Sequence, residues 1–463
     1  MTTWTPELTE RAGPRYRAIA DALADDVKGG RLKEGARLPT HRDLAAALRV
    51  TVGTVSRAYA EAERRGLVKG EVGRGTFVRR DHGEPLDFGM RLREEGSVID
   101  LSLNFPIGEA DDRLLRSTLV AVAKDPRLGR LIEYLPHAGL LRHREAGAAW
   151  VNRAGLETRP EEVIVCNGGQ HALAIALIAL ASPGDVVLAE AVTYPVFKTL
   201  AALLHLKIVG LPLDDQGLRP DAFEAACKAG APKILYCVPT IQNPTATVLP
   251  KARRKKIAAI ARAHDVTILE DDIYGLLPRE RPLPLAHHAP DRTVFISSLS
   301  KTVAPGLRIG FMAASRALTD RMIPALCATT WMASPLMAEL AARLIEDGTA
   351  DAILERKRKE AAARQAIAAK ILPGSPGPGA HPLSYHLWLP LPEPWRGTEF
   401  ADRARQRGVA VNPGEVFAAG GVKPPAAVRV CLGAARSRDQ LEKGLRILRD
   451  TLEAAPLSGL AVV

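Results

Sequence analysis

The stretch VFISSLSKTVAPGLR, residues 294–308, begins with an apolar strand-like run and ends in a basic side chain. Its serines lead to Lys301, and Arg308 follows seven residues later. The amine of a lysine attacks an aldehyde only when it is partly deprotonated, a state that a dry pocket and a neighbouring cation promote. The stretch therefore predicts a reactive lysine at the end of a strand. Arg308 is either the neighbouring cation or, with the hydroxyl of Ser298, a partner for a phosphate.

Short aliphatic strands alternate with helices around this stretch. The expected strands are residues 163–165, 186–188, 234–236, 266–269 and 294–296. Helices are expected between them, for example over 168–181 and 250–264. This alternation predicts an α/β fold with a mostly parallel sheet covered on both faces and ligands bound beyond the carboxyl ends of the strands. A Pro- and Gly-rich loop at 373–382 marks the boundary of a smaller C-terminal subdomain.

Further polar residues follow these strands. Asp271, after the strand ending at 269, is the acid expected to keep a pyridine nitrogen protonated, with Tyr274 donating to the ring oxygen. Asn243 offers its amide to the same oxygen, and Tyr194 could stack on the ring. Residues 167–170, Asn-Gly-Gly-Gln, offer backbone N–H groups at a helix N-terminus, where phosphate binds well. Each motif alone has an ordinary structural explanation, but their shared position at strand ends favours a cofactor pocket.

Residues 100–463 resemble the fold-type I pyridoxal-phosphate aminotransferases. The resemblance implies that Lys301 binds the cofactor aldehyde, Asp271 the pyridine nitrogen, and Asn243 and Tyr274 the ring hydroxyl. It implies stacking by Tyr194 and places four residues at phosphate-binding positions: Gly169, Gln170, Ser298 and Arg308.

Two further roles follow from the same resemblance. Tyr134 matches a tyrosine that reaches the phosphate of the neighbouring subunit, which requires a homodimer. Arg429 matches the arginine that binds the α-carboxylate of an amino acid, a bidentate role suited to guanidinium; an ordinary salt bridge is the alternative. Ala246 stands where relatives often have glycine, which affects a loop rather than the chemistry.

A different pattern occupies residues 1–80. Apolar residues at helical spacing predict a helix from Tyr16 that ends at Gly29-Gly30, and Thr40 is expected to cap a second helix. A third helix follows with a buried stripe of four residues, Val52, Val55, Tyr59 and Ala62, and ends at Gly66. Two strands, 67–69 and 76–78, are joined by a glycine-rich tip. This order predicts a winged helix-turn-helix.

The N-terminal unit also carries the residues expected to contact DNA. A recognition helix needs short polar or basic groups near its N-terminus, since that end reaches the base edges. The residues that meet this need are Thr51, Thr54, Ser56 and Arg57. Arg42 and Arg74 could contact phosphates or the minor groove. Residues 38–78 resemble the GntR-type winged helix-turn-helix, although Val52 stands where that family often has arginine.

Charge supports this division of the chain. The net charge is +11, and residues 1–80 carry +6 of it, as expected of a segment that meets a polyanion, although a solvated basic surface remains the alternative. Residues 81–99 are expected to be a linker. The sequence predicts no membrane span and no secretion signal, and its five cysteines lack C-x-x-C spacing, which favours reduced thiols in a cytoplasmic protein without bound metal.

The combination resembles the MocR/GabR family of bacterial transcriptional regulators. It implies a homodimer that binds double-stranded operator DNA through residues 1–80 and senses pyridoxal phosphate or an amino compound through residues 100–463. An active aminotransferase with an appended DNA-binding module is the alternative, because nothing required for half-transamination is missing. A regulator of vitamin B6 synthesis that responds to the cofactor alone is a third reading.

Overall fold

The structure of the chain is a computed structural model that describes residues 4–6, 8, 14–29, 31–33, 35–64, 67–71, 75–78, 98–107, 112–372, 374, 377 and 379–454. The chain divides into two compact units, Met1–Phe88 and Gly89–Val463. The linker expected at 81–99 falls almost entirely outside the described residues. Its last residue, Ile99, belongs to β3 (Ile99–Asp100), a strand of the larger unit.

The smaller unit has the predicted order of a winged helix-turn-helix. Its elements are α1 (Arg15–Lys28), α2 (His41–Leu48), α3 (Val52–Arg64), β1 (Val68–Glu71) and β2 (Gly75–Val78). Helix α1 ends at Gly29, and the Thr40 side chain caps α2 by accepting a hydrogen bond of 3.2 Å from the backbone N–H of Asp43. The two strands pair antiparallel, with Val68 opposite Val78. One apolar core joins the three helices and the strands, and includes Ile19, Leu23, Leu44, Val55 and Tyr59.

One residue of the expected buried stripe lies outside the core. Val52 is 46% exposed, whereas Val55, Tyr59 and Ala62 are buried as predicted. Helical spacing puts Val52 on the same face, but it is the first residue of α3 and projects beyond the packed part of that face. Gly66 and most of the wing tip, including Arg74, lie outside the described residues.

A seven-stranded sheet forms the centre of the larger unit. Its spatial order is β4 (Val163–Cys166), β12 (Gly310–Ala313), β11 (Thr293–Ser298), β10 (Thr267–Asp271), β9 (Ile234–Cys237), β5 (Val186–Glu190) and β6 (Lys207–Leu211). Strand β12 is antiparallel to both neighbours, and the other pairings are parallel. The five strands expected from sequence are all present. The predicted parallel α/β sheet is therefore confirmed, with β12 and β6 in addition.

Both faces of this sheet are covered. In β4, Val163 and Val165 pack into one core while Ile164 and Cys166 pack into another, as the two-residue period of a strand requires. One face carries α6 (Gly169–Leu180), α7 (Pro195–Leu203) and α12 (Arg316–Thr330). The opposite side carries α5 (Leu141–Asn152), α8 (Pro220–Ala229), α9 (Lys251–Ala263), α10 (Leu285–His288) and α13 (Pro335–Glu346).

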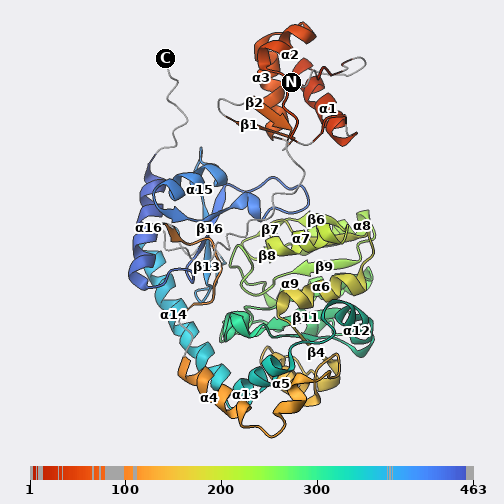
Figure 1. Ribbon diagram of the computed structural model, residues 1–463, viewed down its shortest axis with the longest axis vertical. Helices are drawn as coiled ribbons and strands as arrows, with labels where there is room; N and C mark the ends of the chain where they lie inside the picture. Colours follow the sequence, from red (N-terminus) through yellow and green to blue (C-terminus); the bar gives the residue numbers. More distant parts are fainter. Residues whose placement is uncertain are drawn as a thin grey trace. The chain divides into compact units, whose positions relative to one another are not determined.

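A smaller C-terminal part lies beside the large sheet (Figure 1). Its sheet orders β13 (His386–Pro390), β16 (Ala427–Cys431) and β15 (Asn412–Pro413), packed with α15 (Gly397–Gln406) and α16 (Arg438–Glu453). β3 pairs with β14 (Val409–Ala410), and the long α14 (Thr349–Ile371) also contributes to this core. The remaining elements are α4 (Asp112–Ala123), α11 (Leu299–Thr302), β7 (Leu213–Asp214), β8 (Gly217–Leu218) and four short 3-10 turns: 128–132, 160–162, 305–307 and 414–416.

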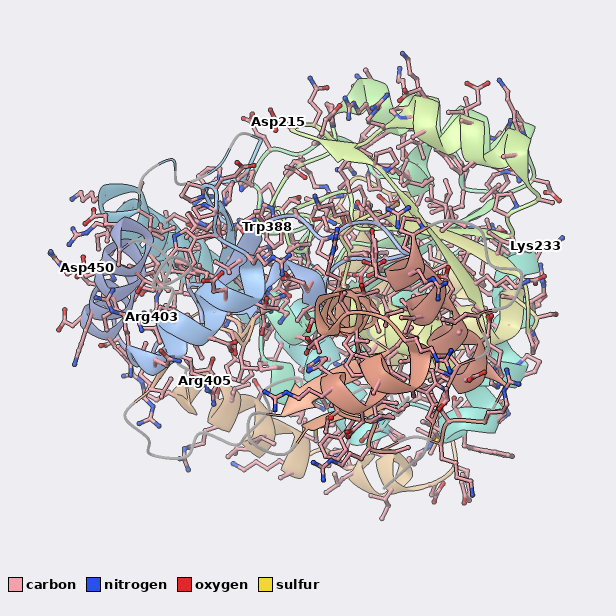
Figure 2. All side chains as sticks on the ribbon, turned by 90° about the horizontal axis from the view of Figure 1, so that it is seen from above. Asp215, Lys233, Trp388, Arg403, Arg405 and Asp450 are labelled. Carbon is pink, nitrogen blue, oxygen red and sulfur yellow. The ribbon has the colours of Figure 1, made fainter. Side chains whose placement is uncertain are left out.

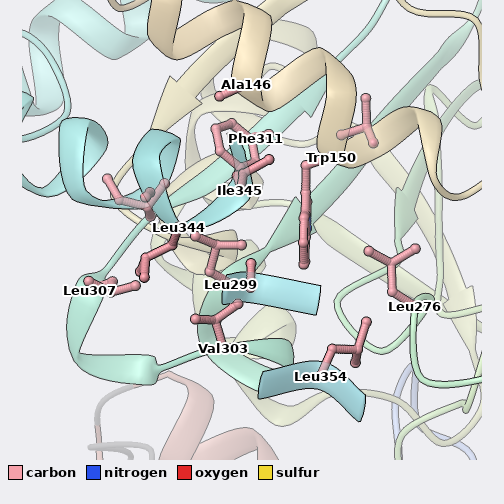
Figure 3. Close-up of a cluster of buried hydrophobic side chains, with 14 of the residues drawn as sticks. Ala146, Trp150, Leu276, Leu299, Val303, Leu307, Phe311, Leu344, Ile345 and Leu354 are labelled. Carbon is pink, nitrogen blue, oxygen red and sulfur yellow. The ribbon is translucent and has the colours of Figure 1, made fainter. Parts of the chain in front are cut away.

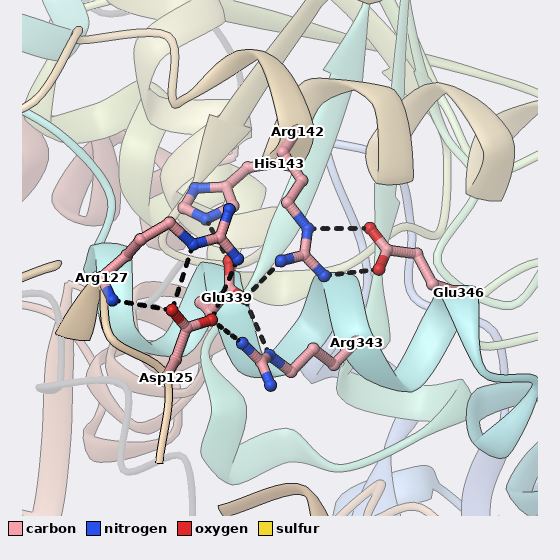
Figure 4. Close-up of polar contacts among 7 residues, drawn as sticks. All are labelled: Asp125, Arg127, Arg142, His143, Glu339, Arg343 and Glu346. Atoms are coloured by element: carbon pink, nitrogen blue, oxygen red, sulfur yellow. Dashed lines mark hydrogen bonds and ion pairs between the residues drawn. The ribbon is translucent and has the colours of Figure 1, made fainter. Parts of the chain in front are cut away.

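A buried carboxylate ties α13 to α5. Glu339 accepts hydrogen bonds from Arg142 (2.7 Å), His143 (3.2 Å) and Arg343 (2.8 Å), and Arg343 also pairs with Asp125 (Figure 4). Burial acts to raise the pKa of Glu339, but its hydrogen bonds and the neighbouring arginines outweigh burial and lower the pKa to about 2. The ionised carboxylate therefore stabilises this junction.

Charged side chains cover the outside of the larger unit. Lys233, Arg405 and Asp450, for example, are all exposed (Figure 2). Among the described residues, none of the helices combines the length and apolarity that crossing a bilayer would require.

Candidate functional site

Lys301 is held rigidly where β11 leads into α11. Leu299 and Val303, two residues to either side of it, are buried in the core that also contains Trp150 (Figure 3). The hydroxyl of Tyr385 donates a hydrogen bond of 2.9 Å to the carbonyl of Lys301. The buried neighbours and this hydrogen bond therefore hold the backbone at Lys301 in place.

The amine of Lys301 donates a hydrogen bond to the backbone carbonyl of Asn104. Burial lowers the pKa of this amine to about 8, and the positive charges of Arg429 and Lys357 add to the effect. Arg308, which the sequence suggested as the neighbouring cation or as a phosphate partner, is not among the main charges that act on this amine. With a pKa of about 8, roughly a tenth of this amine is neutral at pH 7, far more than for an ordinary lysine, and the neutral amine is the nucleophile.

Asp271 ends the neighbouring strand β10 and is buried. Its Oδ2 accepts a hydrogen bond of 2.8 Å from the hydroxyl of Tyr236, and its Oδ1 accepts one of 3.4 Å from the backbone N–H of Ile273. Burial raises the pKa of Asp271 to about 6, although these hydrogen bonds oppose the rise. The ring of Tyr236 stacks on Phe197 at 4.2 Å. This carboxyl is suited to hold a proton on a basic ring nitrogen.

Arg429 and Tyr274 bring donors to the same pocket. The Nη1 of Arg429 donates to the Oδ1 of Asn243 at 2.8 Å, and its Nη2 donates to the carbonyl of Ser102 at 2.8 Å. Since an arginine only donates, the Asn243 amide nitrogen is left to donate elsewhere. Tyr274 accepts from the side chain of Asn104 at 2.8 Å and lies 5.9 Å from the Lys301 amine, measured to the ring centroid. The Nε of Arg429 is buried without a hydrogen-bond partner among the described residues.

Small and hydroxylated residues surround Arg308 next to Lys301. We call this group, which consists of Gly168, Ser298, Ser300 and Arg308, the cup. Gly168 has a positive φ of 84°, and a Cβ there would lie 2.8 Å from Nη2 of Arg308. Arg308 approaches Ser300 Oγ (3.5 Å) and the carbonyl of Asn167 (3.4 Å). The hydroxyl of Ser298 lies within hydrogen-bond distance of the Ile309 carbonyl and caps α11. The cup therefore holds a cation, hydroxyls and the N-terminus of α6, which begins at Gly169.

The two candidate aromatic residues lie in different surroundings. The Tyr194 hydroxyl accepts a hydrogen bond of 3.0 Å from Gln170, which ties this ring to the cup. Tyr134 is 83% exposed and contacts the ring of Trp331, with centroids 5.8 Å apart. Trp331 is itself 49% exposed.

The candidate DNA-contacting residues lie at the start of α3 and on α2. Arg42, Ser56 and Arg57 are exposed, and Arg57 stacks its guanidinium 4.8 Å from the ring centroid of Tyr16. The hydroxyl of Thr51 accepts from the backbone N–H of Thr54 at 3.2 Å and so caps the helix. Arg74 lies outside the described residues.

Sequence reasoning missed three residues around the pocket. Ser300, next to Lys301, contacts Arg308, and its nearness to the lysine was the available signal. Asn104 contacts Lys301 and Tyr274, and His386 contacts Asn104 at 3.1 Å. No local pattern marks Asn104 or His386, because they are brought together only by the tertiary fold.

Comparisons with known proteins agree with this architecture. Residues 15–78 match the gntR family of bacterial regulatory proteins, and residues 97–448 match the aminotransferase class I and II family. The chain is 33% identical over 454 residues to the uncharacterized HTH-type transcriptional regulator YdeF of Bacillus subtilis, with 97% of each chain covered. The chain belongs to the MocR/GabR family of transcriptional regulators. The HTH-type transcriptional regulator TauR of Rhodobacter capsulatus is 26% identical over 453 residues, which cover 88% of this chain and 90% of its own length.

Solved aminotransferases share the fold of the larger unit. The multiple substrate aminotransferase of Thermococcus profundus superposes with a TM-score of 0.72 at 24% identity and covers 81% of this chain and 95% of its own. The kynurenine aminotransferase of Pyrococcus horikoshii gives 0.70 at 24% identity, covering 77% of this chain and 91% of its own. A MocR/GabR chain thus combines a DNA-reading unit with an aminotransferase fold.

Pyridoxal phosphate is the cofactor of aminotransferase class I and II domains, and the residues present fit it. The amine of lowered pKa, the buried Asp271, the freed donor of Asn243 and the cup beside Arg308 supply one complementary group for each part of the molecule. The small Gly168 allows Arg308 to lie at this position, because a Cβ there would come within 2.8 Å of its guanidinium.

Proposed function

We propose that this MocR/GabR-family regulator binds pyridoxal phosphate at Lys301 and changes its affinity for operator DNA when the cofactor or an amino compound occupies the pocket. The observation that carries the proposal is the Lys301 amine, which has a pKa of about 8, donates to Asn104 and interacts with the charge of Asp271, in a chain that also carries a helix-turn-helix. Lys198 and Lys357 also have a pKa of about 8 and donate to backbone carbonyls. Lys301 differs from them in its position, since it follows β11 at the end of the central sheet, next to the strand that ends at Asp271.

When bound, pyridoxal phosphate supplies an electrophilic aldehyde and an electron-withdrawing ring. In the proposed arrangement Lys301 presents its neutral amine to the aldehyde, Asp271 holds the proton on the ring nitrogen, and Tyr274 and Asn243 donate to the ring oxygen. Tyr194 stacks on the ring. The phosphate is proposed to lie in the cup, with four residues contributing: Gly169, Gln170, Ser298 and Arg308.

Arg429 is proposed to select an effector that carries a carboxylate next to an amine. Its two terminal nitrogens are anchored by Asn243 and Ser102, which fixes the plane of the guanidinium, and Phe417 supports it from 4.7 Å. The buried Nε still lacks an acceptor, and a carboxylate is the group that satisfies it. An amino acid or a related amino compound carries both the carboxylate and the amine.

The DNA partner is proposed to be double-stranded operator DNA. Arg42 and Arg57 present cations beside the start of α3, and Ser56 offers a hydroxyl on the same exposed helix. Thr54 and Thr51 complete the proposed reading surface, although Thr51 also caps the helix. Arg74 remains a proposed contact from the wing.

A homodimer is proposed because Tyr134 and Trp331 expose a pair of aromatic rings on the larger unit. In a dimer, Tyr134 would reach the phosphate of the neighbouring subunit, as the resemblance implied. Sedimentation of the full chain tests this. A dimer in the wild type that is weakened by Tyr134→Ala supports the proposal, and a monomer at all concentrations contradicts it.

The second candidate function is aminotransfer itself. The neutral fraction of the Lys301 amine favours this candidate, because the same amine is able to move a proton at the substrate carbon. One experiment separates the two functions: an operator mobility-shift titration with and without pyridoxal phosphate and a panel of amino acids, run beside a turnover assay. A ligand-dependent shift without turnover supports a sensor. Steady turnover with DNA binding unaffected by ligands supports the enzyme, and a response to the cofactor alone supports a sensor of vitamin B6.

A further inference from the structure

His386 is a buried histidine whose two ring nitrogens have fixed roles. Its Nε2 lies 3.0 Å from the backbone carbonyl of Gln242, which only accepts hydrogen bonds, so Nε2 carries the proton. Burial, together with the charges of Arg429 and Lys301, lowers the pKa of His386 to about 3, although the hydrogen bond to Gln242 opposes the change. The ring is therefore neutral, and its Nδ1 is an acceptor.

This acceptor determines the orientation of the Asn104 amide. The Nδ2 of Asn104 lies 3.1 Å from Nδ1 of His386 and 2.8 Å from the hydroxyl oxygen of Tyr274. An amide nitrogen has two protons, and here each has one acceptor. The reversed amide would place its oxygen against the lone pair of Nδ1, which is repulsive. The Oδ1 of Asn104 is accordingly left buried without a partner among the described residues.

The orientation of Asn104 in turn determines what Tyr274 does with its own proton. Because the hydroxyl oxygen of Tyr274 accepts from Asn104, the hydroxyl proton cannot point at Asn104. Tyr274 is buried and its ring makes edge-to-face contacts with the rings of Tyr385 and His386. The proton is thus available to another acceptor, and the Lys301 amine lies 5.9 Å from the centroid of the same ring.

We propose that Asn104 and His386 are positioning residues that hold the hydroxyl proton of Tyr274 toward the ring oxygen of the bound cofactor. The inference rests on the proposed function, because it needs a ligand whose ring oxygen accepts from Tyr274. It predicts that cofactor affinity depends more on the direction of the hydrogen bond between Asn104 and Tyr274 than on the space that the Asn104 side chain fills.

Two substitutions of Asn104 separate direction from space. Asn104→Asp keeps the size but replaces the donor by an acceptor, so the proton of Tyr274 turns toward position 104. Asn104→Ala removes the donor and leaves Tyr274 free to rotate. The full chain is titrated with pyridoxal phosphate, and the dissociation constant and the visible absorption maximum are measured. We expect Asn104→Asp to weaken binding at least about fivefold more than Asn104→Ala, with a shifted maximum, since hydrogen bonds to charged oxygens are the stronger ones.

The same variants in a Tyr274→Phe background isolate the effect. If Asn104 acts through Tyr274, Asn104→Asp adds less than about a twofold loss once the hydroxyl is gone, as expected for coupled residues. Binding by Asn104→Asp as tight as by Asn104→Ala overturns the inference, because only space would then matter. An equal loss with and without the hydroxyl also overturns it and indicates a direct effect of the new charge.

A second variant keeps the test open if Asn104→Asp fails to fold. His386→Leu removes the acceptor that orients Asn104, so we expect it to weaken binding of pyridoxal phosphate several-fold. In the Tyr274→Phe background, the same substitution should no longer weaken binding. A loss that persists there contradicts the inference. Failure of the wild type to bind pyridoxal phosphate contradicts the proposed function itself, which is a different outcome from all of these.

Discussion

The hydroxyl of Tyr236 donates a hydrogen bond of 2.8 Å to Oδ2 of Asp271, inside the strand layer beneath the pocket. This bond favours the ionised carboxylate and opposes burial, which raises the pKa of Asp271 to about 6. Tyr236 is thus part of what keeps Asp271 able to hold a proton on a ring nitrogen near neutral pH.

Tyr236→Phe is expected to raise the pKa of Asp271 further, by about one unit for one lost hydrogen bond. Cofactor binding that depends on the ionised carboxylate should then fall at pH 6–7 and recover as the pH is raised through the new pKa. Titrations of the full chain across this range measure it. Tyr385→Phe is the matched control, because its hydroxyl contacts the Lys301 carbonyl instead. A loss that does not change with pH would show that Tyr236 only fills space.

Lys301→Ala is expected to abolish the visible absorption band that the wild type gains with pyridoxal phosphate, because no other amine is proposed to reach the aldehyde. Lys301→Arg keeps the positive charge but has no neutral amine near neutral pH, so it should also lack the band. Absorption spectra and circular dichroism of both variants check this. A retained band in a folded variant would show that Lys301 is not the reacting residue.

Arg42→Ala is expected to weaken operator binding at least about fivefold and to lower the slope of log affinity against log salt by about one, as for a lost phosphate contact. The visible band should stay unchanged. Arg405→Ala, an exposed arginine of the larger unit, serves as the control. Mobility-shift titrations at several salt concentrations give both quantities, and equal affinity of Arg42→Ala and wild type argues against this contact.

Glu339→Gln is expected to cost roughly 3 kcal/mol of stability at pH 7, since it removes the buried negative charge to which Arg142, His143 and Arg343 donate. The folded pKa of Glu339 is about 2 and its ordinary value is 4.5, so its stabilisation is complete above about pH 4.5 and is lost as the pH falls toward 2. The difference between variant and wild type should therefore shrink on acidification. Denaturant unfolding measures it, with Glu346→Gln as the control on the same helix, expected to cost under about 1 kcal/mol. A difference that stays constant with pH contradicts the role of the charge.

Local pattern was sufficient for much of the fold. Continuous apolar runs such as 163–165 predicted buried parallel strands, and Thr40 and Gly29 marked helix ends through their own side chain or backbone. Strand β12 was missed because its four residues begin with glycine. The edge strand β6 was missed because its outer residues are partly exposed and its pattern is weak.

Sequence pattern predicted only some of the residues that line the pocket. Lys301 and Asp271 were found because each follows a strand and carries distinctive chemistry. Asn104 and His386 are 282 residues apart and contact each other only after the C-terminal sheet has folded against the segment that follows β3. Val52 was assigned to the core by spacing alone, and a helix start has too few neighbours to bury it.

The most direct test is operator affinity of the full-length wild type and of Lys301→Ala, each measured with and without pyridoxal phosphate in the same buffer. We predict that the cofactor changes the wild-type affinity at least about fivefold, a coupling in the usual range for linked sites, and that it leaves Lys301→Ala unchanged. An operator affinity that does not respond to pyridoxal phosphate or to amino compounds in the wild type, or that responds equally without the Lys301 amine, would contradict a pocket that controls DNA binding.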